Sequence, residues 1–207
     1  MSDPIYHADL VQGSPEWMAI RTGKWCASNG AEIMGALGSQ GLKDLIKDVA
    51  WGRVFGKLDG GFSTASTRRG HALEPEARDA FAFEHDVSVE QVGFVEHGRI
   101  PNLGWSPDGL HGKRRRALEI KCLEHRAWID FEESRKVPTE YHWQTKIACM
   151  VGRLDGLDFW VFHPLAGGIA IPVEITPEDL DRIEGRIAVL EPRVQAIVDR
   201  LMERKAA

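Results

Sequence analysis

Three residues near the middle of the chain have the types and the spacing of a site for metal-assisted hydrolysis. Asp108 lies in the turn-like run Ser-Pro-Asp-Gly, and Glu119 and Lys121 follow it eleven and thirteen residues later. Because alternate side chains of a β-strand share a face, Glu119 and Lys121 would project together while Ile120 points into the core. The polar run 113–116 has the character of a β-hairpin tip, which would bring Asp108 beside Glu119. The sequence therefore predicts two carboxylates and a lysine in one small volume.

Such a group of side chains is suited to a divalent cation and a phosphodiester. Carboxylates are ligands for Mg²⁺ or Mn²⁺, and Mg²⁺ commonly takes one or two of them together with phosphate and water. A lysine beside the ion could orient or deprotonate an attacking water. The structural alternative is a common Pro-Asp-Gly turn followed by an exposed Glu-x-Lys charge pair. The apolar residues Leu118, Ile120 and Cys122 favour the site, because they predict a strand whose opposite face is buried.

Length and composition predict a soluble globular protein with one domain over residues 1–207. The chain has 43% hydrophobic and 28% charged residues, and it has no apolar stretch long enough to span a membrane. It begins without the pattern of a secretory signal, and its cysteines, Cys26, Cys122 and Cys149, are too scattered for a disulfide framework or a zinc site. We therefore expect a cytoplasmic protein of a bacterial or phage-infected host cell. The net charge of −5 does not exclude DNA binding, which depends on local charge.

The elements that would position the three residues are helices on either side of a central group of strands. Ser14-Pro15-Glu16 is typical of a helix start, and Ser28 is expected to cap a second, short helix that ends at Gly35 or Gly38. Pro75 is expected near a kink or restart of a long helix. The pattern predicts helices over 14–23, 28–35, 42–58, 66–85, 126–136, 138–151 and 177–205, and β-structure over 89–95, 104–122, 157–162 and 169–175. This order predicts an α/β (α+β) fold with a central mixed sheet flanked by helices.

Several short blocks together resemble the phage lambda exonuclease family, also called YqaJ-type viral recombinases, within the PD-(D/E)xK nuclease superfamily. The resemblance runs from about residue 12 to residue 164, and it implies a restriction-endonuclease-like core. The stretch between Ile33 and Arg69 does not align with the family, and the C-terminal helix at 177–205 lies outside the recognisable region. The blocks occur in the family's order, as Gly13-Ser14-Pro15-Glu16-Trp17 with Arg21, Ala27-Ser28, Arg69-Gly70-x-x-x-Glu74, Ser106-Pro107-Asp108-Gly109, Glu119-Ile120-Lys121 and Tyr141-x-x-Gln144.

The resemblance assigns roles to the residues of the predicted metal site. It implies that Asp108 and Glu119 are metal ligands, helped by the backbone carbonyl of Ile120, and that Lys121 assists the nucleophilic water. Gln144 would hold the water or the lysine, although an ordinary polar helix residue would look the same in the sequence.

Glu74 would be a further acid near the metal. The alternative for Glu74 is a helical ion pair with Arg78 at i+4.

The resemblance also implies a pocket for the 5′-phosphate of a DNA end, formed by Arg21 and Ser28. Arginine binds phosphate through two parallel hydrogen bonds, and a helix starting at Ser28 would offer unpaired N–H groups. The alternative is that both residues only cap helices. Tyr141, one turn before Gln144, is placed with the DNA-binding residues on the resemblance alone.

By resemblance, the protein would be a Mg²⁺-dependent (or Mn²⁺-dependent) exonuclease that digests duplex DNA ends from 5′ to 3′. It would leave 3′ single strands for a single-strand annealing protein or a recombinase, and it would be a homo-oligomer, a trimer by analogy. One alternative is a structure-specific or restriction-type endonuclease of the same superfamily. Another is a non-catalytic DNA-end-binding module, which the intact Asp108, Glu119 and Lys121 set disfavours.

Overall fold

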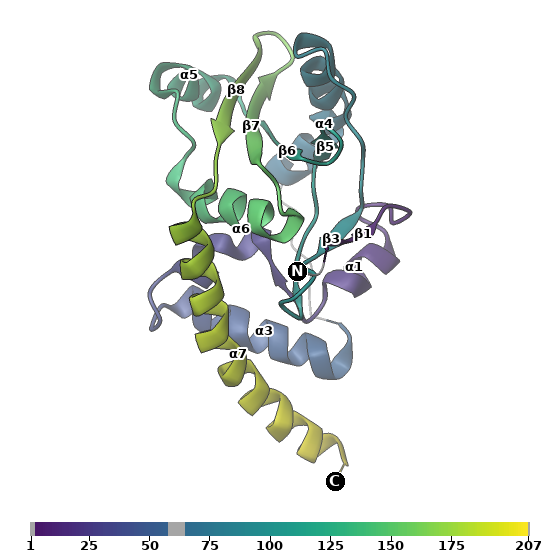
Figure 1. The fold of residues 1–207 in the computed structure, drawn as a ribbon, viewed down its shortest axis with the longest axis vertical. Coiled ribbons are helices and arrows are strands. Elements are labelled where there is room, and N and C mark those ends of the chain that lie inside the picture. Colours follow the sequence, from purple (N-terminus) through teal and green to yellow (C-terminus); the bar gives the residue numbers. More distant parts are fainter. Residues whose placement is uncertain (1–2, 58–64, 207) are drawn as a thin grey trace.

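The strands form two four-stranded mixed sheets, joined by the short connection 106–108. A computed structural model of the chain describes residues 3–57 and 65–206 (Figure 1). The first sheet has the order β1-β3-β4-β2, with β1 (Ile5–His7), β3 (Phe94–Glu96), β4 (Leu103–Trp105) and β2 (Trp25–Cys26). The second has the order β5-β6-β7-β8, with β5 (Gly109–His111), β6 (Arg116–Cys122), β7 (Gly156–His163) and β8 (Gly167–Val173). The β2–β4 and β6–β7 pairs are parallel and the others are antiparallel.

The helices follow the predicted order, and the predicted α/β class with helices flanking mixed sheet structure is confirmed. They are α1 (Pro15–Arg21), α2 (Gly30–Met34), α3 (Gln40–Phe55), α4 (Ala65–Glu84), α5 (His125–Ser134), α6 (His142–Gly152) and α7 (Pro177–Ala206), with short 3₁₀ turns η1 (Ala27–Asn29) and η2 (Thr139–Tyr141). Pro75 lies inside α4. No helix in the described ranges is both long and apolar enough to cross a membrane.

One predicted helix start is right and one is wrong. The Ser14 hydroxyl accepts a hydrogen bond from the Trp17 N–H at 3.2 Å, as expected of an N-cap that precedes a proline. Ser28, in contrast, lies inside η1 and caps nothing, and α2 begins two residues later without a side-chain cap. The hydroxyl of Ser28 instead accepts a hydrogen bond from Arg21. The expected helix N-terminus at Ser28 is therefore replaced by a tight turn that directs this hydroxyl to a neighbouring element.

Strand β6 is buried on both faces, and this sets the orientation of the predicted site. Leu118 and Ile120 pack with Phe81 of α4 and with Trp160 in a small core between α4 and the second sheet. Because successive side chains alternate, Glu119 and Lys121 face the other way, toward α6. A larger core fills the space between the sheets and helices α3, α6 and α7. Figure 1 shows α7 running past α3 and extending away from the strands.

Candidate active site

The β5–β6 hairpin brings together the three residues from which the metal site was predicted. Gly109 pairs with Leu118 in the antiparallel ladder, so Asp108 and Glu119 lie opposite each other at the start of the pairing. The Asp108 Oδ2 atom accepts a hydrogen bond from the Ile120 N–H at 2.7 Å. Lys121 Nζ donates to Glu119 Oε1 at 2.7 Å. A backbone N–H therefore holds the Asp108 carboxylate, and the neighbouring lysine side chain holds that of Glu119.

Gln144 of α6 and Tyr141 of the preceding turn η2 both contact this group of residues. Gln144 Nε2 donates to the same Glu119 oxygen at 2.5 Å, so the amide and the lysine converge on one carboxylate. The Tyr141 ring lies 4.6 Å from Lys121 Nζ and packs on Phe159. The resemblance grouped Tyr141 with the DNA-binding residues, and that role stays a prediction. We call Asp108, Glu119, Lys121 and Gln144 the acid cluster.

The acid cluster has more negative charge than its surroundings neutralise. Burial, followed by the charge of Glu119, raises the pKa of Asp108 well above its usual value. Burial alone would lower the pKa of Lys121, but the charges of Glu119 and Asp108 outweigh it and raise that pKa. Lys121 therefore stays protonated at neutral pH, and even so Asp108 ionises with difficulty. A cation beside the two carboxylates would relieve this repulsion.

The side chains present fit a hard divalent ion. Asp108 and Glu119 offer oxygen ligands only, and Mg²⁺ commonly takes just one or two carboxylates. Within residues 3–57 and 65–206, no three His, Cys, Asp or Glu side chains converge closely enough to hold an ion by themselves. Carbonyl, water or phosphate oxygens would have to complete the shell, and the Ile120 carbonyl stays a prediction for that purpose.

Glu74 lies at the edge of the acid cluster, and both interpretations made from the sequence apply to it. Its Oε1 atom accepts a hydrogen bond from Arg78 at 2.5 Å, which is the i+4 ion pair. The Arg78 Nε atom also donates to the backbone oxygen of Asp108 at 2.7 Å. The charge of Glu74 contributes to the raised pKa of Asp108. Arg78 is a site residue that the sequence did not reveal, since its only signal was the spacing from Glu74.

Arg21 and Ser28 lie together, and Ser106 joins them. The Arg21 guanidinium donates to Ser106 Oγ at 2.8 Å and to Ser28 Oγ at 3.2 Å. It lies over the Trp17 ring at 4.3 Å, and the Trp17 indole N–H also donates to Ser106 Oγ, at 3.0 Å. In the part of the chain that the structure describes, Arg21 has no carboxylate partner. We call Arg21, Ser28 and Ser106 the hydroxyl pocket.

Ser106 was missed as a site residue, although it stands two residues before Asp108 in the motif itself. Of the hydroxyl pocket, Arg21 lines an open cavity of about 740 Å³ between α1 and α3, which Trp17 and Lys24 also line. The residues of the acid cluster do not line this cavity. Arg21 is therefore reachable from a side that the acids do not occupy.

Two links hold the hydroxyl pocket and the acid cluster at a short, fixed separation. The first is the connection from Ser106 to Asp108, whose ends are at most about 7 Å apart; its Pro107 carbonyl accepts a hydrogen bond from Gln12 at 2.7 Å. The second is a close approach between Gly30, just after Ser28, and α6. A Cβ atom on Gly30 would lie 2.5 Å from the backbone nitrogen of Gln144. Only glycine allows this contact.

The basic run at the hairpin tip is largely used within the molecule. Arg114 pairs with Glu90, Arg115 pairs with Asp155, and Arg116 binds Asp158 through two hydrogen bonds. These contacts agree with the predicted hairpin tip.

Comparisons with known proteins agree with this geometry. An alkaline exonuclease (LHK-Exo) from Laribacter hongkongensis has a similar structure, with a TM-score of 0.84 and 25% identity over 93% of this chain and 98% of that one. The same enzyme in complex with dAMP also matches, with a TM-score of 0.84 and 26% identity over the same shares of the two chains. A phage-related exonuclease from Haemophilus somnus 129PT shares the fold, with a TM-score of 0.62 and 14% identity over 88% of this chain and 96% of that one.

A search of curated protein sequences found no match to this chain. The family model of the YqaJ-like viral recombinase domain matches residues 16–153, which include both the hydroxyl pocket and the acid cluster. This is the family whose motifs the sequence resembles. The chain is a member of the YqaJ-like viral recombinase family.

Proposed function

We propose that the protein is a Mg²⁺-dependent exonuclease that digests duplex DNA ends from 5′ to 3′ and leaves 3′ single strands. The observation that carries the proposal is the close pairing of two unlike sites. The acid cluster has unneutralised carboxylates suited to a cation, and the hydroxyl pocket has an arginine and two hydroxyls suited to a phosphate. The similarity to an alkaline exonuclease, and to its complex with dAMP, supports a nuclease that releases deoxynucleotides.

In this proposal the hydroxyl pocket selects the DNA end. Arg21 would bind the terminal 5′-phosphate with its fork of N–H donors, and Ser28 and Ser106 would donate their hydroxyls. The short connection from Ser106 to Asp108 would then place a neighbouring phosphodiester over the acid cluster. An end that lacks the phosphate would bind less tightly and in a less defined register.

The acid cluster would perform the hydrolysis. Asp108 and Glu119 would hold the divalent ion, which when bound lowers the pKa of water and stabilises charge on the phosphate. Lys121 would orient the attacking water, while Gln144 keeps the Glu119 carboxylate in place. Water adds to phosphorus as the bond to the 3′ oxygen breaks, and that oxygen leaves with a proton. The released nucleotide keeps its 5′-phosphate and the shortened strand acquires a new one, which suits the pocket for the next cycle.

The expected partners follow from the product and from the family resemblance. A 3′ single strand is the substrate of a single-strand annealing protein or a recombinase, so we propose that one of these receives it. We also propose a homo-oligomer, a trimer by analogy, which would keep the enzyme on DNA between cuts. Measurement of the native mass together with the run length on long duplexes tests this, and a monomer with long runs would contradict it.

The test of the function uses linear duplex DNA with 5′-phosphate or 5′-hydroxyl ends, and covalently closed circular DNA, each with Mg²⁺ or EDTA. We expect Mg²⁺-dependent digestion of the linear DNA only, faster on 5′-phosphate ends, and no digestion by the Lys121→Ala variant. Cutting of the closed circle would instead indicate an endonuclease. Binding of DNA ends without any cleavage would indicate a non-catalytic end-binding module.

A further inference from the structure

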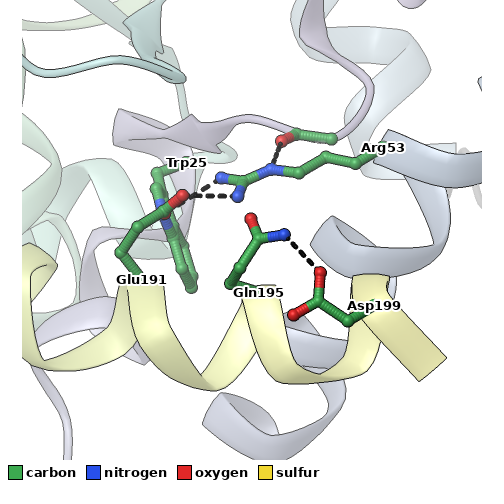
Figure 2. Close-up of polar contacts among 6 residues, drawn as sticks. Trp25, Arg53, Glu191, Gln195 and Asp199 are labelled. Carbon is green, nitrogen blue, oxygen red and sulfur yellow. Dashed lines mark hydrogen bonds and ion pairs between the residues drawn. The ribbon is translucent and has the colours of Figure 1, made fainter. Parts of the chain in front are cut away.

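An ion pair far from the acid cluster holds the chain segment that carries the hydroxyl pocket. Arg53 of α3 binds Glu191 of α7 through two hydrogen bonds, of 2.5 and 3.0 Å. Glu191 also accepts a hydrogen bond from the indole N–H of Trp25 at 2.9 Å, and Arg53 Nε donates to the Gly23 carbonyl at 2.9 Å. Figure 2 shows Arg53 reaching across to Glu191 beside Trp25. We call the side chains of Arg53, Glu191 and Trp25 the clamp.

The clamp acts on the short segment between the two pocket residues of the N-terminal region. Arg21 ends α1, and Ser28 lies in η1, so the six residues between them determine how the two side chains meet. Gly23 and Trp25, both within this segment, are the two points that the clamp holds. Trp25 is fully buried, which leaves its indole a single position.

The chain turns at Gly23 and fits closely against α3 there. Gly23 has a φ of +77°, which favours glycine, and a Cβ atom there would lie 2.9 Å from both the Cγ and the backbone nitrogen of Arg53. The Arg53 side chain is only 13% exposed, so its charge needs the Glu191 partner. Burial would raise the pKa of Glu191, but hydrogen bonds from Arg53 and Trp25 outweigh it and lower that pKa. The pair is therefore charged at neutral pH.

We infer that Arg53 and Glu191 are positioning residues for recognition of the DNA 5′-phosphate, because they fix the 22–26 segment that sets Arg21 against Ser28. This inference rests on the proposed function. It also gives a role to α7, which lies beyond residue 153 where the family model ends, and to α3, which the model covers but to which no motif assigned a function. Neither residue touches the phosphate in this arrangement, and each acts through the backbone or the indole that it holds.

The test measures the equilibrium affinity for a duplex end with a 5′-phosphate relative to the same end with a 5′-hydroxyl, in EDTA so that nothing is cleaved. We expect Glu191→Gln and Arg53→Lys to reduce this phosphate preference about three- to tenfold, with little change in affinity for the hydroxyl end. Glu191→Asp, which keeps the charge, should retain part of the preference. It also provides the decisive variant if either of the others fails to fold.

The matched control is Glu184→Gln, on the same helix, which removes an exposed ion pair with Arg99. It should leave the phosphate preference at the level of the unmodified protein. Clamp variants that lower the melting temperature but keep the full preference would overturn the inference, as would variants that change neither quantity. If the unmodified protein itself shows no phosphate preference, the proposed function fails instead, and the two failures are thereby distinguished.

Discussion

The acid cluster and the hydroxyl pocket are built in different ways. Asp108, Glu119 and Lys121 lie within one hairpin, where the pairing of β5 with β6 sets their positions. Arg21, Ser28 and Ser106 come from the end of a helix, a 3₁₀ turn and a connection between sheets. The first group depends on local strand geometry, and the second depends on how separate elements pack.

The two sites also differ in the charge of the ligand that each is suited to bind. Burial and the charge of Glu119 raise the pKa of Asp108, so a cation at the acid cluster would relieve repulsion between the carboxylates. The hydroxyl pocket holds an arginine supported by hydroxyls and an aromatic ring, so it is ready for an anion. On the proposed function, a substrate phosphate and a divalent ion would occupy the two neighbouring sites together.

The largest expected effect comes from Asp108→Asn. Cleavage in Mg²⁺ should fall by about 10³-fold or more, because a ligand of the metal is lost. In EDTA the melting temperature should rise, because the variant removes a carboxylate that is costly to ionise. Differential scanning fluorimetry with and without Mg²⁺ checks this. A lower melting temperature in EDTA would show that the acid cluster is not under electrostatic strain.

The next effect tests the hydroxyl pocket alone. Arg21→Ala should lower kcat/KM on 5′-phosphate ends by about 10- to 100-fold, as expected when a hydrogen-bonded charge is removed. The rate on 5′-hydroxyl ends should change little. Arg21→Lys should recover only part of the loss, since lysine lacks the planar fork. Equal losses on both kinds of end would mean that Arg21 serves the fold rather than the phosphate.

Gly30→Ala tests the link between the two sites. Its Cβ atom would meet the α6 backbone at Gln144, and we expect a loss of about 1–3 kcal/mol in unfolding free energy together with slower cleavage. Chemical denaturation with parallel rate measurements checks both. Gly185→Ala in α7 is the matched control: its Cβ would meet open space, and we expect a neutral or slightly stabilising change. If the two variants changed the unfolding free energy by similar amounts, the close approach of Gly30 to α6 would not be the cause.

The smallest effect concerns acid stability away from both sites. Burial would raise the pKa of Asp158, but hydrogen bonds from His111 and Arg116 outweigh it and lower that pKa to about 2. The lowered pKa stabilises the fold above about pH 4, and the contribution is lost as the pH falls toward 2. After allowance for solvent screening it amounts to about 1 kcal/mol. Urea unfolding between pH 2 and 6 checks this. The unfolding free energy of Asp158→Asn should change less with pH than that of the unmodified protein.

The sequence predicted that Asp108, Glu119 and Lys121 lie together, because the information for this is local. A two-residue alternation and a short polar tip were enough to place Asp108 opposite Glu119. The larger helices and strands β6, β7 and β8 were also predicted, since they are long enough to show a period. In contrast, β1 and β2 have only three and two residues, too few for a pattern to appear.

The sequence predicted the hydroxyl pocket only in part. Arg21 and Ser28 were found from motifs, but the expected helix cap at Ser28 was wrong, because a serine that caps a helix and one that accepts from an arginine look alike. Ser106 lies in the connection between the two sheets, and its contact with Arg21 depends on how distant segments pack. The division of the strands into two sheets likewise depends on contacts between distant segments.

Glu191 has a consequence for how the protein is made. Its contacts with Arg53 and Trp25 span 138 and 166 residues, so they can form only after α7 has left the ribosome. Contacts of such long range form late, because a large loop must close first. A nascent chain would thus already carry its acid hairpin while the segment before Ser28 is still unfixed. On the proposed function, recognition of a DNA end would mature only after Glu191 has been synthesised and has paired with Arg53.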